Sequence, residues 1–119
     1  HAKKMTELDA VWLAQALPHF ESSLEPLKRL SDFQVSIAGR TLWARFGKAD
    51  DRGNTHSVRL SVEHRRKGYA CFSLFVYAGL SAESVPIHMD TEVGAAVIVE
   101  RLMASHKRDF QRLIAYLSR

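Results

Sequence analysis

Four arginines near the end of the chain have a spacing that suits phosphate binding. They are Arg101, Arg108, Arg112 and Arg119, separated by 7, 4 and 7 residues. A helix advances about 100° per residue, so an unbroken helix places them within roughly 20° of one line. Asp109 is the only acid within residues 101–119, so most of the usual opposite-charge pairing is missing. The row predicts a basic ridge that meets phosphates, and the polar face of an ordinary amphipathic helix remains the alternative.

A second set combines aromatic and basic side chains on predicted strands. Apolar residues alternate with polar ones over 42–46 and 58–62, which is typical of half-buried strands. If the apolar residues face helices, the opposite face of the sheet holds Trp43, Arg45, Arg59, Tyr69, Phe75 and Tyr77. Such a face can stack bases and bind phosphate, as RNA-binding sheets do. Two alternatives stay open: a protein interface, and a face covered by the N-terminal helices.

A third feature is the basic turn Arg65-Arg66-Lys67, preceded by a loop that carries Lys48 and Arg52. These side chains predict phosphate contacts that add affinity without sequence preference, or else a turn that is simply solvated. The charge distribution supports the first interpretation. Residues 40–67 hold eight Lys and Arg against three acids, residues 101–119 hold five against one, and residues 68–100 hold no Lys or Arg.

Signatures of catalysis and metal binding are weak. The six histidines lack close metal-ligand spacing, and His56 and His64 stand at the two ends of one predicted strand. Cys71 lies in an apolar strand without an adjacent base, which favours a structural role. No glycine-rich phosphate loop is present. We therefore expect no enzymatic activity, no metal and no cofactor.

The periodicity of the chain predicts an α+β fold. A helix should begin at Thr6 and end near Pro18, and a second helical piece should cover about 20–30. Strands are predicted at 33–37, 41–46, 58–63 and 69–78, residues 79–89 should form a loop, and a long helix should follow, unbroken or split near Ser105-His106. The architecture is then a four-stranded antiparallel meander sheet with helices in a second layer. The predicted core contains Phe33, Val35, Leu42, Phe46, Leu60, Val62, Phe72, Leu74, Phe110, Ile114 and Leu117.

Length and composition place these elements in one domain. The 119 residues suit a single domain, 1–119, in which residues 1–5 are either disordered or foreign to the native protein. A single cysteine allows no internal disulfide and favours a reducing, cytoplasmic location. The sequence contains no run of about 18 apolar residues, so it predicts no membrane span. A net charge of +4 favours a non-enzymatic module that binds nucleic acid without sequence preference or works in a nucleic-acid machine. The alternative is a protein-interaction domain, in one version a homodimer, that uses the aromatic sheet face.

Overall fold

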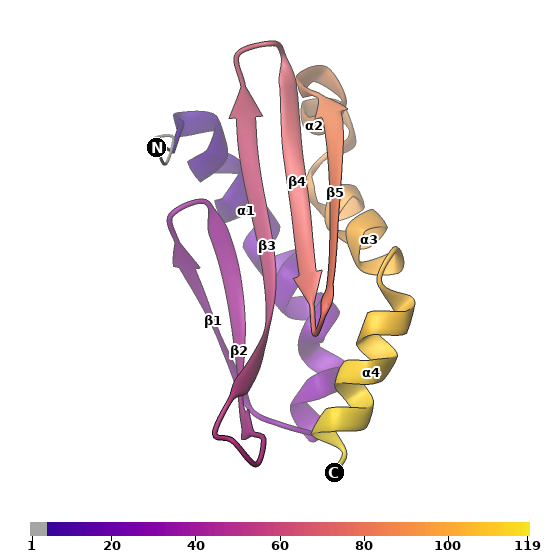
Figure 1. The fold of residues 1–119 in the computed structure, drawn as a ribbon. Helices are drawn as coiled ribbons and strands as arrows, with labels where there is room; N and C mark the ends of the chain where they lie inside the picture. Colours follow the sequence, from indigo (N-terminus) through magenta and orange to yellow (C-terminus); the bar gives the residue numbers. More distant parts are fainter. Residues whose placement is uncertain (1–4) are drawn as a thin grey trace.

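The computed structural model describes residues 5–119 as one antiparallel sheet with helices on one of its faces (Figure 1). Residues 1–4, to which the prediction of a disordered or foreign N-terminus largely applies, lie outside the described part. The elements in chain order are α1 (Glu7–Leu24), η1 (Glu25–Arg29), β1 (Phe33–Ala38), β2 (Thr41–Ala49), β3 (Thr55–Arg65), β4 (Tyr69–Val76), β5 (Gly79–Pro86), α2 (Ile87–Val93), α3 (Ala95–Ala104) and α4 (Lys107–Leu117).

Helix α1 begins where the sequence predicts and ends later. The Thr6 N–H donates to Asp9 Oδ2 at 3.0 Å, and the Asp9 N–H donates to Thr6 Oγ1 at 3.1 Å, which closes the capping box. The predicted end near Pro18 is wrong, because α1 continues through Pro18 to Leu24. Phe20, beyond the proline, is fully buried, and its packing outweighs the hydrogen bond that proline cannot donate. The second helical piece is the five-residue 3₁₀ helix η1.

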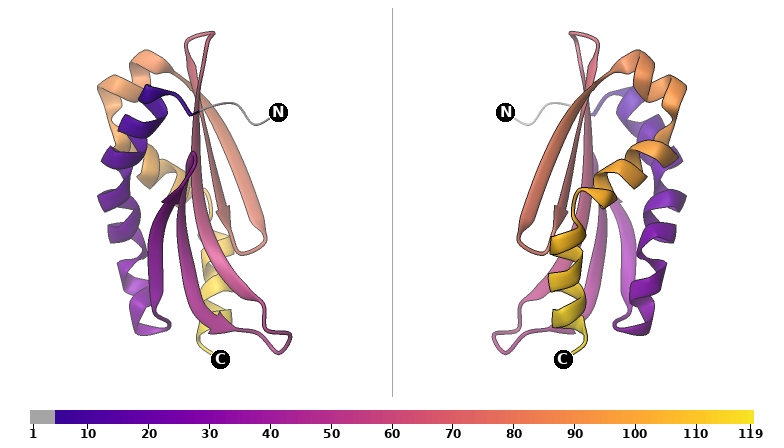
Figure 2. Two further views of the ribbon diagram at one scale, coloured as in Figure 1. Left: turned by 90° about the vertical axis from the view of Figure 1, so that its left-hand side faces the viewer. Right: turned by 90° about the vertical axis from the view of Figure 1, so that its right-hand side faces the viewer.

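The sheet is a meander in which each strand pairs with the next, in the order β1-β2-β3-β4-β5. Alternate side chains of β2, β3 and β4 are buried, as the period of two requires. Helices α1, α3 and α4 cover that face, and the views along the sheet show all of them on the same side (Figure 2). The core between the two layers includes Phe20, Phe46 and Phe72.

The structure corrects the strand count from four to five. Residues 79–86, predicted as part of a loop, form β5, which pairs with β4 from Val76↔Gly79 to Tyr69↔Pro86. This strand lacks the apolar alternation that would identify it, because its helix-facing positions include Ser81 and Glu83. Their side chains bond to groups on the helices, so backbone pairing and polar contacts hold the strand in place.

The C-terminal helical region is divided into three helices. It breaks at Gly94, whose φ is +82°, and again at Ser105-His106, where the split form of the prediction placed it. The predicted core residues lie on the inner face. Seven are buried: Leu42, Phe46, Leu60, Val62, Phe72, Leu74 and Leu117. Four are partly buried and pack against the others: Phe33, Val35, Phe110 and Ile114.

Among the helices that the structure describes, none combines the length and the apolar character that a bilayer crossing requires.

Candidate functional site

The face of the sheet that points away from the helices is open to solvent (Figure 2). It is the face seen in Figure 1, and we call it the open face. The alternative that N-terminal helices cover it is wrong, because α1 packs on the opposite face, where Trp12, Ala16 and Phe20 join the core. Because side chains alternate along a strand, every second residue of the five strands points to this uncovered face and is available for contact with another molecule.

A row of side chains across the middle of the open face combines aromatic rings with a guanidinium. The register places Ser36, Trp43, Arg59, Phe75 and Leu80 side by side on the five strands. The guanidinium carbon of Arg59 lies 4.8 Å from the ring centroid of Trp43 and 4.2 Å from that of Phe75. Such distances are within the range of cation–π attraction. We call Trp43, Arg59 and Phe75 the aromatic stripe.

A second arginine extends the stripe along β2. The guanidinium carbon of Arg45 lies 4.4 Å from the centroid of Trp43, so both arginines are stacked on the same ring. Stacking fixes the orientation of a guanidinium while its N–H groups remain free to donate. Arg45 reaches only Ser36 Oγ, at 3.5 Å, and is otherwise exposed. The Nε of Arg59 is buried and has no hydrogen-bond partner among the described residues.

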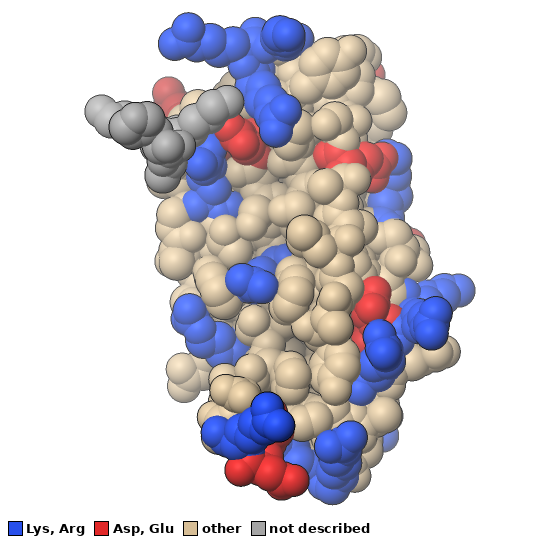
Figure 3. Space-filling model, in the orientation of Figure 1, with Lys and Arg blue, Asp and Glu red and all other residues tan. Residues whose placement is uncertain are grey.

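Negative charge is scarce on this face. Glu63 is the only carboxylate among the strand residues whose register places them on the open face. It is paired with Arg40, whose Nη1 lies 3.4 Å from its Oε1. Figure 3, which looks onto the open face, shows Lys and Arg at several places around a centre of mostly uncharged residues, with smaller groups of Asp and Glu among them. The face therefore presents stacked rings inside a border in which Lys and Arg predominate.

Above the stripe, towards the β3–β4 turn, the open face carries small side chains. Thr41, Ser61, Ser73 and Ala82 form the neighbouring cross-strand row. Thr41 Oγ1 and Ser61 Oγ are hydrogen-bonded at 2.8 Å. These short side chains help to line a hollow of about 320 Å³ on the sheet surface. The hollow leads from the aromatic stripe towards the β3–β4 turn.

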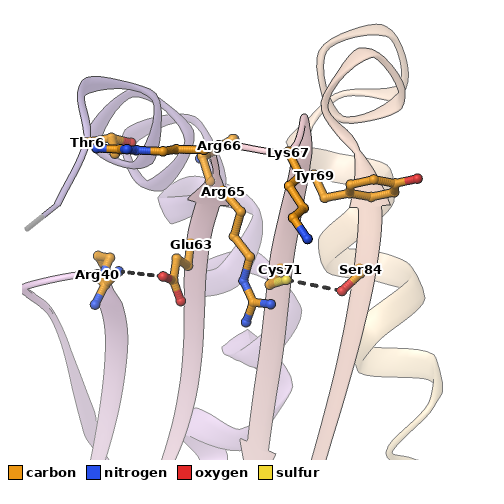
Figure 4. Close-up of a pocket in the computed structure, with 10 residues that line it drawn as sticks. Thr6, Arg40, Glu63, Arg65, Arg66, Lys67, Tyr69, Cys71 and Ser84 are labelled. Atoms are coloured by element: carbon orange, nitrogen blue, oxygen red, sulfur yellow. Dashed lines mark hydrogen bonds and ion pairs between the residues drawn. The ribbon is translucent and has the colours of Figure 1, made fainter. Parts of the chain in front are cut away.

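A larger pocket lies at that end of the sheet (Figure 4). Its volume is about 920 Å³, and we call it the upper pocket. The residues that line it are Thr6, Arg40, Glu63, His64, Arg65, Arg66, Lys67, Tyr69, Cys71 and Ser84. Figure 4 shows the ends of Arg65 and Lys67 directed over the strands, with Tyr69 on the opposite side. Cys71 Sγ and Ser84 Oγ lie 3.1 Å apart on its floor.

The structure brings most of the predicted strand residues together in two groups. Trp43, Arg45, Arg59 and Phe75 meet in and beside the aromatic stripe, and Arg65, Arg66, Lys67 and Tyr69 meet at the upper pocket. Three further residues of this surface were not predicted from the sequence: Arg40, Ser84 and Leu80. The last two belong to β5, which was predicted as a loop, and the position of Arg40 depends on a pairing across two strands.

Tyr77 is the exception among the predicted face residues. Its φ is +57°, a left-handed conformation in the turn between β4 and β5. The turn directs its ring to the helix side, where it stacks on His56 at 4.7 Å between centroids and lies 6.2 Å from Tyr116. Its predicted place on the open face is therefore wrong, because strict alternation ends where the hairpin turn begins.

The arginine row of the C-terminal region is also corrected. The break at Ser105-His106 separates Arg101 in α3 from Arg108 and Arg112 in α4, so the four side chains do not share one line. Arg101 has an acidic partner that the sequence did not reveal, the carboxylate of Glu83 on β5. Arg119 lies beyond α4, with its guanidinium carbon 5.6 Å from the ring centroid of Tyr116.

The two basic segments nevertheless approach each other at one end of the molecule. Lys48, at the end of β2, donates from Nζ to the carbonyl oxygen of Leu117 at 3.0 Å and to that of Arg119. Lys48 therefore holds the end of β2 against the C-terminal end of α4. Arg108 and Arg112 remain exposed on α4.

Under the sheet, a histidine lies between two carboxylates. His64 Nδ1 is 2.7 Å from Asp9 Oδ1, and His64 Nε2 is 2.9 Å from Asp90 Oδ2. All three residues are buried. Burial alone would raise the pKa of the Asp9 carboxyl, but hydrogen bonds from Thr6 and His64 together lower it below its ordinary value. These contacts link α1, β3 and α2. The sequence signal for them, which we did not use, is that His64 continues the inward-facing alternation of apolar residues along β3.

A second histidine cluster has the connectivity of a nucleophilic triad. His106 Nε2 lies 2.8 Å from Ser81 Oγ, and His106 Nδ1 lies 2.8 Å from Asp109 Oδ2. Ser81, His106 and Asp109 line none of the upper pocket, the smaller hollow and two further pockets in the described part of the chain. The arrangement joins β5 to the break between α3 and α4, where His106 is the N-cap residue.

Within residues 5–119, no group of three or more histidine, cysteine, aspartate or glutamate residues has an arrangement that could hold a metal ion.

Neither a family model, a curated protein nor a solved structure matches this chain.

Proposed function

We propose that the protein is a binding module whose open face takes single-stranded nucleic acid. The observation that carries the proposal is the aromatic stripe, in which two rings hold the Arg59 guanidinium on a sheet face that no helix covers. Single-strand-binding proteins combine a basic groove with rings on which bases stack. The aromatic stripe supplies the rings, and Arg59 with the neighbouring Arg45 supplies positive charge beside them.

Bases and phosphates have separate contacts in this proposal. Unpaired bases stack on Trp43, on Phe75 and on the guanidinium planes that cover them. Phosphates accept hydrogen bonds from the exposed guanidinium of Arg45 and from the terminal N–H groups of Arg59, which is partly buried. A duplex keeps its bases inside the helix, so it offers only its phosphates to this surface. We therefore expect single strands to bind more tightly than duplexes of the same length.

The experiment is a titration of fluorescently labelled oligothymidine and oligouridine, about 12 nucleotides long, followed by anisotropy at several salt concentrations. About four phosphate contacts give a slope of about −3 for the log of the binding constant against the log of salt concentration, at about −0.7 per contact on single strands. Trp43→Ala should remove about 1–3 kcal/mol of binding free energy, the usual loss for one stacked base. Folded protein at tens of micromolar that leaves both oligonucleotides unbound at ~50 mM salt would refute the proposal.

A protein interface is the second candidate, and an exposed apolar side chain favours it. Leu80, in the same row as the aromatic stripe, is 70% exposed. Exposed apolar residues beside aromatic rings and arginine are typical of interfaces. In the homodimer version, the mass in solution rises with concentration and Trp43→Ala shifts it towards the monomer. A constant monomer mass up to about 1 mM would exclude that version.

A further inference from the structure

The upper pocket holds more positive charge than its carboxylate can balance. Arg65, Arg66 and Lys67 surround it, and Glu63 is paired with Arg40. Among the described residues, none of the first three side chains has an acidic partner within ion-pair distance. Three cations around one hollow attract an anion with more than one negative charge, because each further cation adds to the local potential.

The pocket also offers neutral hydrogen-bonding groups and an aromatic wall. The Cys71 thiol and the Ser84 hydroxyl form its floor, and the hydroxyl can donate to an oxygen above it. Tyr69, which is 46% exposed, stands opposite Arg65 in the register of β3 and β4. Figure 4 shows Arg65 and Lys67 reaching over the floor, whereas Arg66 extends towards Thr6. A phosphate group above Cys71 and Ser84 therefore meets donors from several sides, with a ring beside it for a base.

The pocket is continuous with the surface that carries the proposed function. The hollow of about 320 Å³ shares Arg40, Glu63, Arg65 and Cys71 with the upper pocket. It continues to Ser61 and Ser73, in the row next to the aromatic stripe. From Arg59 to Arg65 the distance along β3 is about 20 Å at 3.3 Å per residue. A chain of nucleotides lying on the stripe can thus enter the pocket without leaving the sheet.

We propose that the upper pocket binds the terminal phosphate monoester of the nucleic-acid strand that lies on the open face. A phosphate monoester carries a charge of about −1.5 to −2 at pH 7, whereas each internal phosphodiester carries one negative charge. The extra charge and the extra terminal oxygen match the two cations over the floor, Arg65 and Lys67, with Arg66 adding to the positive potential around the pocket. This inference rests on the proposed function, since it names the part of the strand that the end of the sheet recognises.

The experiment compares three oligonucleotides of one sequence, with an internal label and with a 5′-phosphate, a 3′-phosphate or hydroxyl groups at both ends. One phosphorylated form should bind about tenfold more tightly than the hydroxyl form, which is the effect of one added charge-assisted hydrogen bond. The double variant Arg65→Gln, Lys67→Gln should lose this preference. The control Arg108→Gln, Arg112→Gln removes the same charge from α4 and should retain it.

The outcomes separate this inference from the proposed function. Equal affinity of all three oligonucleotides overturns the terminal-phosphate inference and leaves single-strand binding intact. Absence of binding by all three overturns both. A nucleoside 5′-monophosphate is the fourth ligand, and its binding is followed by the amide NMR signals of residues 65–71. If it binds there while the oligonucleotides show no preference, the pocket is a site for free nucleotides and the inference is wrong.

Discussion

The two faces of the sheet use the same strands for different purposes. On β4, Phe72 points into the core and is almost fully buried, while Phe75 lies three residues later on the open face beside Arg59. On β3, His64 is enclosed between two carboxylates, whereas Arg59 is only partly buried and stacks between Trp43 and Phe75. Alternation along a strand therefore divides its residues into two sets: inward-facing side chains stabilise the fold, and outward-facing side chains are available for contact with a partner.

The two variants Phe72→Ala and Phe75→Ala test this division with the largest expected difference in the free energy of unfolding. Phe72→Ala should lower the free energy of unfolding by about 3–5 kcal/mol, because it removes a large buried ring and leaves a cavity. Phe75→Ala leaves the core intact and should cost less than about 1.5 kcal/mol, mostly through the lost contact with Arg59. Chemical denaturation measures both values. Equal losses for the two variants would show that the open face is as much a part of the core as the inner face.

The buried histidine gives the next effect. Asp9→Asn should destabilise the fold by about 3 kcal/mol, because it removes one charge of a buried, hydrogen-bonded cluster and replaces an acceptor oxygen, facing Thr6 or His64, by an amide donor. Asp50→Asn is the matched control, since Asp50 accepts hydrogen bonds from Arg52 and Asn54 in a surface loop. It should cost far less in the same denaturation experiment. A loss at Asp9 no larger than that at Asp50 would contradict a role of this cluster in stability.

The same carboxyl predicts how stability depends on pH. The pKa of Asp9 is lower than its ordinary value: burial raises it, and the hydrogen bonds from Thr6 and His64 lower it by more. A group with a lowered folded pKa adds stability above its unfolded pKa, about 3.9, and this contribution is lost as the pH falls through the folded value. The native chain should therefore lose stability below about pH 4. Asp9→Asn should flatten this decline, and an unchanged pH profile would exclude the carboxyl as its source.

On the open face the expected effects concern binding rather than folding. Arg45→Gln with Arg59→Gln should weaken single-strand binding and reduce the salt slope by about 1.4, at about 0.7 per lost phosphate contact. Arg108→Gln with Arg112→Gln changes the net charge equally but acts on α4, so its effect on the slope should be smaller. Anisotropy titrations at three salt concentrations compare the two. A larger loss from the α4 pair would move the binding surface to the helix.

The sequence predicted the inner face well because burial imposes a strict period on strong β formers. Leu42, Phe46, Leu60 and Val62 alternate with polar residues, and all four are buried. The same period identified Trp43, Arg45, Arg59 and Phe75 as neighbours on the other face. β5 escaped prediction because small and polar residues occupy both of its sides, so its pairing with β4 left no periodic signal.

The other differences come from contacts between distant segments. The break at Ser105-His106 depends on His106 meeting Ser81 from β5, and the pairing of Arg101 with Glu83 depends on the same strand. A helical wheel drawn from the sequence contains neither contact, so it aligned arginines that the fold separates. Tyr77 left the predicted face because of its left-handed turn conformation, which is rare for a tyrosine.

The most direct test of the account uses the two tryptophans, because each reports on one face of the sheet. Trp12 is buried among the helices against Phe72, and Trp43 belongs to the aromatic stripe. In a two-dimensional NMR spectrum their side-chain indole N–H groups give two signals, which Trp43→Phe assigns. Titration with single-stranded oligonucleotide should shift the Trp43 signal progressively and leave the Trp12 signal in place. A Trp43 signal that stays unmoved while the strand binds, or a shift of Trp12 alone, would contradict binding at the open face.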